Sequence, residues 1–147
     1  MAWQGSTVTQ PVTYSKFTLV TPDDAALEHA PLQPFPFVSS SHFRIVTLIN
    51  EPAVQAVYED WFKDNPIEWV YWLDTVHFVI QGRAEITYWD APNWEEAKTV
   101  QAGPGSFYLA PRGCRAKWKV LSDEPFRRIV LDIPNGGYVT PDTANGG

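Results

Sequence analysis

Residues 68–86 read EWVYWLDTVHFVIQGRAEI, and this stretch decides the fold. Aromatic and β-branched residues dominate it, which is typical of β-strands. We expect one strand over 68–72, a second over 75–81 after a short joint, and a third from Ala84. Gly82 lies where a hairpin turn needs a positive φ. The stretch therefore predicts successive strands around which the rest of the chain folds.

Alternation along these strands brings chemically useful side chains to one face. Neighbouring residues in a strand point to opposite sides, so Trp69 and Tyr71 share one face, as do Thr75 and His77. If the two strands turn these faces to the same side, an indole, a phenol and an imidazole meet there. We expect the function of the protein on that face.

Further short strands are expected on both sides of the central stretch. They are predicted over residues 12–20, 43–49, 84–89, 99–101, 106–110, 114–121 and 126–133. Glycine and proline turns separate the last four of them. Many short strands at close spacing predict an all-β fold, a single closed sandwich or barrel.

Two short helices are expected in the N-terminal half. Thr21 and Pro22 suit an N-cap and a first helical position, and the helix should end near His29. A second helix is expected between Asn50 and Asn65, because apolar residues there recur at helical spacing. Prolines at positions 31, 34 and 36 predict an irregular chain between the two.

Length and composition bound the class of protein. The 147 residues predict one domain over 1–147, with a loose arm over 1–12 and a flexible tail over 135–147. Cys114 is the only cysteine, so an intramolecular disulfide and a cysteine-built zinc site are excluded. With no leader pattern and no apolar run of membrane length, we expect a cytoplasmic protein without a membrane partner.

Charge and aromatic content point to the partner. The net charge of −6 argues against nucleic acid. The 21 aromatic residues, seven of them tryptophan, are more than an ordinary core needs. They predict a pocket with flat walls or a large dimer interface, and we expect a small aromatic or hydrophobic molecule as the partner and a homodimer as the assembly.

A glycine and proline frame in the second half resembles a known family. Gly105, Pro111 and Gly113 are spaced as in Gly-x5-Pro-x-Gly-x2-His-x3-Asn, and Gly82 suits the end of Gly-x5-His-x-His-x3-4-Glu-x6-Gly. These two patterns are similar to the diagnostic segments of the cupins, small jelly-roll β-barrels. The resemblance covers roughly residues 68–120 and implies a single jelly-roll barrel.

The metal ligands of that family are missing from the matching positions. The two histidine positions fall at Trp69 and Tyr71, the glutamate position at Thr75 and the last histidine position at Ala116. Indole and methyl side chains offer no donor to a transition metal. We therefore expect no metal and no other cofactor. An unorthodox site of His77 with His42, Glu85 or Glu51 stays open as an alternative.

The resemblance also fixes which side chains line the barrel. Trp69, Thr75, Cys114 and Trp118 are expected to join Tyr71 and His77 inside, as substrate-binding residues. The alternate residues 115, 117 and 119 should point outward as a solvated basic face. Arg112 is expected at the rim, and Arg44 could clamp a carboxylate or phenolate, or could be an ordinary surface charge.

His77 and Tyr71 are the candidate catalytic residues. An imidazole with modest burial titrates near neutral pH and can act as a general base or acid, although a structural core histidine fits equally well. The Tyr71 hydroxyl can donate a proton or hold an oxyanion, or the ring can simply pack in the core. Cys114 is a small buried hydrophobe, or a thiol activated by His77.

Three functions fit these residues. The first is a metal-independent cupin-type enzyme, a lyase, isomerase, cyclase or dehydratase, that performs acid–base chemistry on a small aromatic or polyketide-like carbonyl compound. The second is a non-catalytic cupin that binds a small molecule. The third is a metal-dependent cupin dioxygenase with unorthodox ligands.

Overall fold

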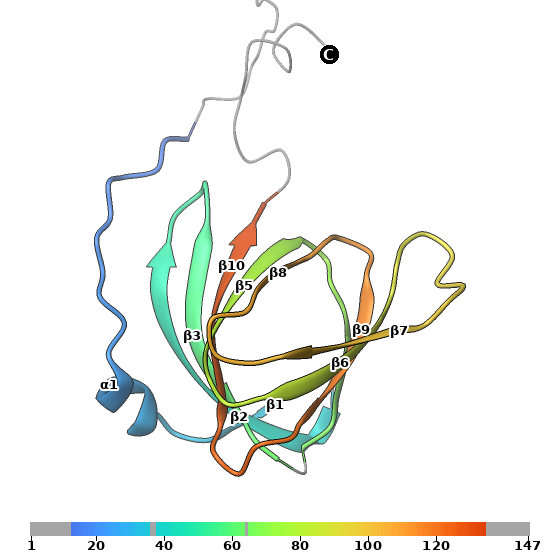
Figure 1. The fold of residues 1–147 in the computed structure, drawn as a ribbon. Helices are drawn as coiled ribbons and strands as arrows, with labels where there is room; N and C mark the ends of the chain where they lie inside the picture. The colour runs from blue at the N-terminus through green and yellow to red at the C-terminus, as the bar shows by residue number, and fades with distance from the viewer. Residues whose placement is uncertain (1–12, 36–37, 64, 135–147) are drawn as a thin grey trace, which may run out of the picture.

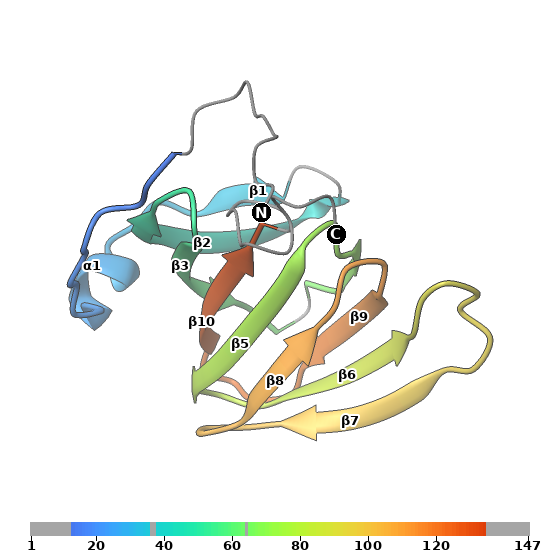
Figure 2. The same cartoon turned by 90° about the horizontal axis from the view of Figure 1, so that it is seen from above.

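The strands form two antiparallel sheets that lie face to face (Figures 1 and 2). The structure, a computed structural model, describes residues 13–35, 38–63 and 65–134. One sheet has the order β1-β2-β3-β10-β5-β8 and the other β4-β9-β6-β7. The elements are α1 (Asp24–Glu28), β1 (Gln33–Phe35), β2 (Val38–Asn50), β3 (Gln55–Trp61), β4 (Ile67–Val70), β5 (Asp74–Gln81), β6 (Ala84–Trp89), β7 (Lys98–Ala102), β8 (Phe107–Ala110), β9 (Arg115–Val120) and β10 (Phe126–Ile133). The predicted all-β jelly roll with a short N-terminal helix is confirmed.

The central stretch folds as predicted and joins the two sheets. β4 belongs to the four-stranded sheet and β5 to the six-stranded sheet, so residues 71–73 carry the chain across. The inward faces of β4 and β5 therefore lie opposite each other across the barrel. Gly82 has φ +81°, and a Cβ there would lie 2.5 Å from the carbonyl oxygen of Pro125. Only glycine fits this turn.

The prediction of a second helix is wrong, because residues 55–61 form strand β3. β3 pairs with β2 on one side and β10 on the other. α1 covers its outer face and the barrel interior its inner face, so Tyr58, Glu59, Asp60 and Trp61 are all buried. A strand that is buried on both faces lacks the alternation of polar and apolar residues. The apolar residues of this segment therefore recur at a spacing that resembles that of a helix.

Two other local predictions also need correction. Residues 13–20 are extended but belong to no strand. They are held at the β2–β3 connection, where the amide of Lys16 donates to Glu51 and the amide of Ala53 donates to Ser15. The proline-rich chain nevertheless contains β1, an edge strand, where Pro34 removes no ladder bond from the sheet interior.

The remaining predictions from the sequence concern the chain ends, the start of α1 and a membrane span. The predicted arm over 1–12 and tail over 135–147 lie outside the described residues. α1 has its N-cap at Asp23 rather than Thr21, and the Asp23 side chain accepts from the amide of Ala25. No helix in the described part of the chain is long and apolar enough to cross a membrane.

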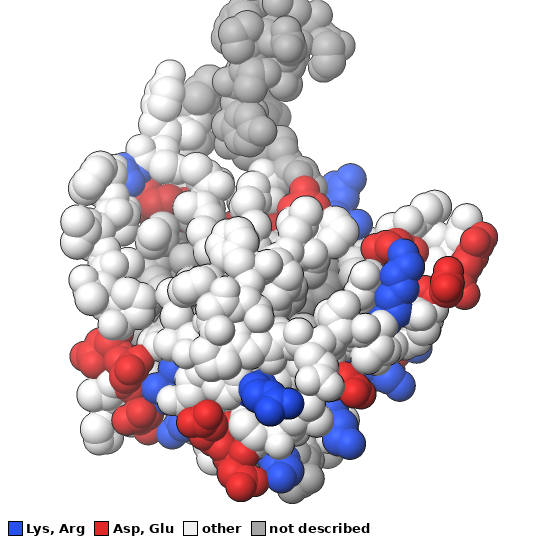
Figure 3. All heavy atoms as spheres, in the orientation of Figure 1, with Lys and Arg blue, Asp and Glu red and all other residues white. Residues whose placement is uncertain are grey.

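The outer face of the six-stranded sheet is covered over only part of its width. α1 packs over β2 and β3, and under it the guanidinium of Arg127 binds the buried carboxylate of Asp60 through two hydrogen bonds. Over β5 and β8, the large apolar side chains of Phe78, Ile80, Phe107 and Leu109 are exposed. The middle of the face in Figure 3, where Figure 1 places β5 and β8, is largely free of charge.

Candidate functional site

A cavity of about 370 Å³ lies between the two sheets. Its walls are mainly aromatic, from Phe35, Phe43, Trp61, Trp69, Tyr71 and Trp118. Phe43 stacks on Trp61 with ring centroids 4.8 Å apart, and Trp118 meets Trp61 edge to face at 5.5 Å. Interlocked rings of this kind form rigid, flat, apolar walls. The cavity suits a small planar molecule.

A larger hollow of about 980 Å³ lies outside the barrel, on the four-stranded sheet. Its polar side chains, such as Glu85, Lys117 and Lys119, lie on the outer face of the sheet. The interior cavity is smaller, yet it holds the buried titratable groups. We therefore place the candidate site inside the barrel, because buried polar groups in an apolar cavity are the signature of a binding or active site.

His77 is completely buried in the wall of this cavity. Its ring lies flat on Tyr108, with centroids 4.5 Å apart, and meets Tyr71 edge to face at 5.6 Å. Its Nε2 lies 2.9 Å from the hydroxyl oxygen of Thr75, and that hydroxyl donates to the carbonyl oxygen of Ala110. A hydroxyl has one proton, so the Thr75 oxygen accepts from Nε2–H. This assignment leaves Nδ1 as an unprotonated acceptor.

The Nδ1 atom of His77 is a buried acceptor without a partner in the described part of the chain. Burial in the first place, and the charge of Arg128 in the second, hold the pKa of His77 well below 6.5. The expectation of an imidazole that titrates near neutral pH is therefore wrong. Burial is complete rather than modest, and the imidazole stays neutral at pH 7.

Two buried donors accompany this acceptor. Nε1 of Trp118 has no hydrogen-bond partner among the described residues. Burial raises the pKa of Tyr71 far above its usual value, so the phenol keeps its proton and remains a donor. Buried polar groups without partners are rare in folded proteins and require an explanation. A ligand that offers one donor and accepts from the indole would satisfy both unpartnered atoms, and the Tyr71 phenol is a further donor in the same wall.

A buried ion pair forms the charged part of the cavity wall. Arg128 donates from Nε to Glu59 at 2.8 Å and from Nη1 to the hydroxyl of Tyr108 at 2.8 Å. Its guanidinium lies 4.7 Å from the ring centre of Trp118. Burial alone would lower the pKa of Arg128, but Tyr108 and Glu59 raise it above its usual value. The cavity therefore holds a permanent cation that one carboxylate balances.

Asp132 is a carboxyl group at the edge of the same cavity. It lines the cavity, is half-buried, and lies opposite Thr75 in the β10–β5 register. No hydrogen bond to its side chain is formed by the described residues. Burial, followed by the charge of Glu59, raises its pKa above the usual 3.8. A carboxyl with these properties can exchange protons with a ligand.

The sequence analysis missed Glu59, Arg128, Tyr108 and Asp132. Glu59 was hidden because residues 50–65 were interpreted as a helix. Arg128 and Asp132 could have been found, since they share one face with Phe126 and Val130 along a strand that was correctly predicted. A charged residue at an inward position is unusual enough to indicate a function.

Five of the eight predicted site residues line the cavity. They are Trp69, Tyr71, Thr75, His77 and Trp118. The structure brings them together because β4 and β9 lie in one sheet and β5 in the other. Residues 115, 117 and 119 alternate with buried residues of β9, and Lys117 and Lys119 are exposed, in agreement with the sequence analysis.

The other three predicted substrate-binding residues lie away from the cavity and need correction. Cys114 is buried in the core beside Ala116, and burial raises the pKa of its thiol. Arg44 points to the opposite face of its sheet, where it binds Asp60 and the carbonyl oxygen of Glu28. Arg112 is exposed, and its backbone amide donates to Asp74. None of these three side chains lines the cavity.

The described residues do not fit a transition metal. The family's ligand positions hold Trp69, Tyr71, Thr75 and Ala116, of which none is a histidine or a carboxylate. In the described ranges, no three or more His, Cys, Asp or Glu side chains gather as a metal site. The unorthodox alternative of His77 with His42, Glu85 or Glu51 is thus not assembled. The carboxylate of Glu59, which lines the cavity, already accepts hydrogen bonds from Arg128 and Trp61.

Known structures share this fold, while no family model and no curated protein matches the chain in sequence. A putative ethanolamine utilization protein Q from Salmonella typhimurium LT2 aligns with a TM-score of 0.60 at 16% identity, over 84% of this chain and 98% of that chain. Hydroxypropylphosphonic acid epoxidase from S. wedmorenis aligns with a TM-score of 0.57 at 12% identity, over 84% and 64%. The Schizosaccharomyces pombe Cnp3 cupin domain aligns with a TM-score of 0.55 at 17% identity, over 74% and 72%. These likenesses show the fold alone, and that fold is the cupin fold.

Proposed function

We propose that this cupin is a metal-independent enzyme that performs acid–base chemistry on a small aromatic or polyketide-like carbonyl compound. The observation that carries the proposal is the unpaired Nδ1 of His77 in the wall of an aromatic cavity that also holds the unpaired indole N–H of Trp118 and the phenol of Tyr71. The aromatic walls would hold the planar part of the substrate. The polar groups would act on the carbon next to its carbonyl.

The first step would be proton abstraction by His77. Nδ1 takes a proton from the carbon next to the carbonyl. The electron pair of the broken C–H bond forms a carbon–carbon double bond, and the π electron pair of the carbonyl moves onto its oxygen. The resulting enolate oxygen accepts a hydrogen bond from Tyr71 and is stabilised by the positive charge of Arg128. Trp118 offers a second hydrogen-bond donor, its indole N–H, from the cavity wall.

The low pKa of His77 favours a substrate with an acidic C–H bond. Arg128 and burial both disfavour the imidazolium, so His77 is a weak base. Such a base suits a carbon between two carbonyls or between a carbonyl and an aromatic ring, where the carbanion is delocalised. Return of the proton to another carbon gives an isomerase, loss of a β-substituent a lyase or dehydratase, and attack on a second carbonyl a cyclase. Asp132 could accept the proton from His77 or protonate the product.

The test uses deuterium exchange, which reports the first step alone. The probe is 4-hydroxyphenylacetone, whose hydrogens lie between a ring and a carbonyl, followed in D₂O by proton NMR. We expect the wild-type protein to accelerate exchange and His77→Gln to lose about 100-fold or more of this activity. Tyr71→Phe should lose about tenfold or more, while both variants retain the probe in equilibrium dialysis.

The second candidate is a non-catalytic cupin that binds a small aromatic molecule. It is favoured by the same low pKa of His77, which suits a permanent hydrogen-bond acceptor as well as a weak base. Binding of the probe without any acceleration of exchange by the wild-type protein would support it. In that case His77→Gln and Tyr71→Phe would change affinity only.

The third function, a metal-dependent dioxygenase, has the least support, because the His, Cys, Asp and Glu side chains of the described residues do not gather as metal ligands. Elemental analysis of the purified protein tests it directly. Stoichiometric iron, manganese, nickel or zinc, lost in His77→Gln, would overturn metal-independent chemistry. We further propose that the protein works in the cytoplasm, without nucleic acid or membrane partners.

A further inference from the structure

A groove of about 280 Å³ continues the aromatic wall of the cavity onto the surface. Trp69 and Trp72 line both the cavity and the groove. Their rings are stacked, with centroids 6.2 Å apart and planes within 11° of parallel. Trp72 nevertheless leaves 70% of its surface exposed. The aromatic surface of the cavity therefore continues outward along the faces of these two tryptophans.

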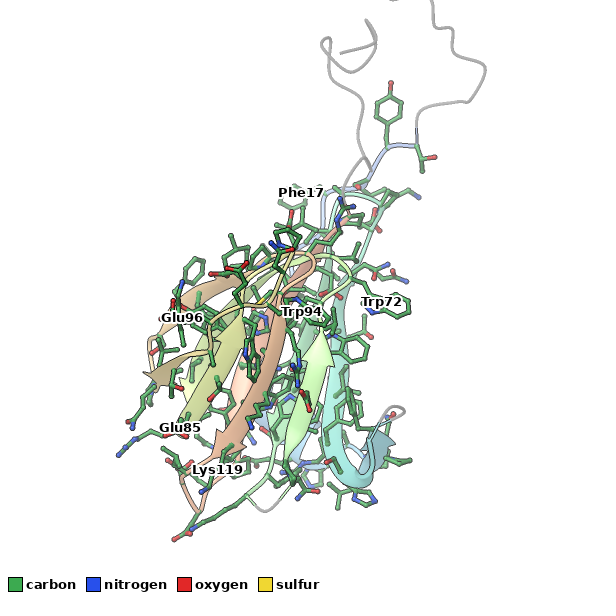
Figure 4. All side chains as sticks on the ribbon, turned by 90° about the vertical axis from the view of Figure 1, so that its right-hand side faces the viewer. Phe17, Trp72, Glu85, Trp94, Glu96 and Lys119 are labelled. Atoms are coloured by element: carbon green, nitrogen blue, oxygen red, sulfur yellow. The ribbon has the colours of Figure 1, made fainter. Side chains whose placement is uncertain are left out.

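Trp94 forms the other side of the groove and is fixed in place. It belongs to the β6–β7 connection, and its φ of +53° is unusual for a bulky residue. Its indole Nε1 donates to the carbonyl oxygen of Gly113 at 2.8 Å, and its backbone amide donates to Asp90. The ring is thus held rigidly although it is well exposed. Figure 4 shows Trp72 and Trp94 on the same side of the molecule.

Arg115 completes the groove without adding net charge. Its Nε donates to the carboxylate of Glu68 at 2.7 Å, and its Nη2 pairs with the same oxygen. Its guanidinium lies 4.4 Å from the ring centre of Trp89 and 5.8 Å from that of Trp94. The groove is therefore flat, rigid and locally neutral. These properties suit a planar ring better than an ion.

We propose that this groove, lined by Trp72, Trp94 and Arg115 and named the outer subsite, binds a second planar ring of an extended aromatic ligand. The first ring of that ligand occupies the cavity, so the inference rests on the proposed function. Exposed aromatic side chains that are already immobilised bind with little loss of side-chain entropy. The ligand class is thus narrowed from small aromatic compounds to compounds with two planar groups joined by a short linker.

The test compares two probes that share one ring. 4-Hydroxyacetophenone carries the ring and carbonyl alone, and 4′-hydroxychalcone carries the same group with a second ring. Isothermal titration calorimetry on the full chain should show that the wild-type protein binds the chalcone at least about tenfold more tightly. Trp94→Ala should remove most of this difference and leave the acetophenone unchanged, because Trp94 lines the groove and not the cavity. Trp72→Ala should also remove most of the difference. Trp94→Phe should retain most of it, and the remote exposed Leu32→Ala should retain all of it.

Two results would overturn the outer subsite, and they separate it from the proposed function. Equal affinity of the wild-type protein for both probes overturns the outer subsite and leaves the cavity intact. Retention of the chalcone preference in both tryptophan variants does the same. A wild-type protein that binds neither probe overturns both proposals together.

A different observation carries a second proposal, on the uncovered outer face of the six-stranded sheet. Phe78, Ile80, Phe107 and Leu109, named the apolar strip, are exposed on β5 and on the edge strand β8. Phe107 exposes 69% of its surface. Residues 13–20, the N-terminal segment, are extended, belong to no strand, and expose Phe17 to 94%. Among the described residues, the chain thus carries a sheet edge without a neighbouring strand and an extended segment that joins no sheet.

We infer that a second copy of this chain covers both surfaces, with the N-terminal segment of each subunit on the apolar strip of the other. The four residues of the strip, with Tyr14, Phe17, Leu19 and Val20, are eight large apolar side chains that the single chain leaves exposed. Exposed apolar side chains that gather in this way mark interaction surfaces. The lack of charge over β5 and β8 lets two acidic chains approach there (Figure 3). Because each subunit gives its segment and offers its strip, the contact is two-fold symmetric and closed.

Light scattering coupled to size-exclusion chromatography tests this dimer. The wild-type protein should have twice the mass of the chain at micromolar concentration. Phe17→Glu and Phe107→Glu should each shift it to the monomer, with unchanged circular dichroism because both side chains are exposed. Leu32→Glu, at an exposed apolar position elsewhere, should stay dimeric. A monomeric wild-type protein, or dimers that resist both substitutions, would overturn the inference.

Discussion

The ring of His77 lies parallel to that of Tyr108, within 10°, and the Tyr108 hydroxyl accepts from Arg128. The candidate base and the buried cation are therefore separated by one aromatic ring. Burial is the main cause of the low pKa of His77, and this arrangement lowers it further, because a proton on His77 would lie close to a second positive charge. The same cation is well placed to stabilise an anion that forms on a ligand.

The first prediction concerns the pH dependence of stability. The pKa of His77 is lower in the folded than in the unfolded protein, so the unfolded chain binds more protons below about pH 6.5. The contribution of His77 is fully present above that pH and is lost as the pH falls, by at most about 1.4 kcal/mol per pH unit. Urea unfolding at pH 7 and pH 5 should show a steeper loss for the wild-type protein than for His77→Gln. Equal losses would contradict the assigned burial of a neutral imidazole.

The second prediction concerns the Glu59–Arg128 ion pair. Glu59→Gln leaves a buried guanidinium without its counter-charge and should lower the free energy of unfolding by about 3 kcal/mol. The double variant Glu59→Leu with Arg128→Met should recover part of this loss, since no charge then remains buried. As a control, Lys63→Met removes an exposed ion pair with Asp123 and should change stability very little. A small effect of Glu59→Gln would show that water reaches the pair.

The third prediction concerns the turn between β5 and β6. Gly82→Ala should cost about 2 kcal/mol or more, because the left-handed backbone is strained and the new Cβ would meet the chain at Pro125. Gly105 has a similar φ of +87° but nothing near its missing Cβ. Gly105→Ala should therefore cost only about 1 kcal/mol. Chemical denaturation measures both, and equal losses would show that steric contact at Gly82 is relieved.

The fourth prediction concerns Cys114. The thiol is 3% exposed and burial raises its pKa, so it should be protonated and inaccessible in the native protein. Native protein should react with Ellman's reagent only at the rate of unfolding, and fully in denaturant. Cys114→Ala should leave probe binding unchanged, because the side chain does not line the cavity. Rapid labelling of the native protein would contradict this account.

Local patterns in the sequence determined much of the framework. The alternation over 75–81 and 126–133, and the turn glycine at position 82, predicted the strands that carry the site. Alternation also predicted that Trp69 shares a face with Tyr71 and Thr75 with His77, and the resemblance to the cupins placed these faces inside the barrel. Side-chain alternation and turn geometry are set by a few neighbouring residues, so these features can be recognised without knowledge of the fold.

Only the tertiary structure decided what surrounds those side chains. β3 is a strand because β2 and β10 flank it, and its pairing brings Glu59 beside Arg128 although 69 positions separate them. That pair, with the burial of His77, sets the charge and the protonation state of the cavity. The sequence left open whether Arg44 binds a ligand or is a surface charge, and in the structure Asp60 holds it on the opposite face of the sheet. Electrostatic environment depends on distances through space, which periodicity along the chain does not encode.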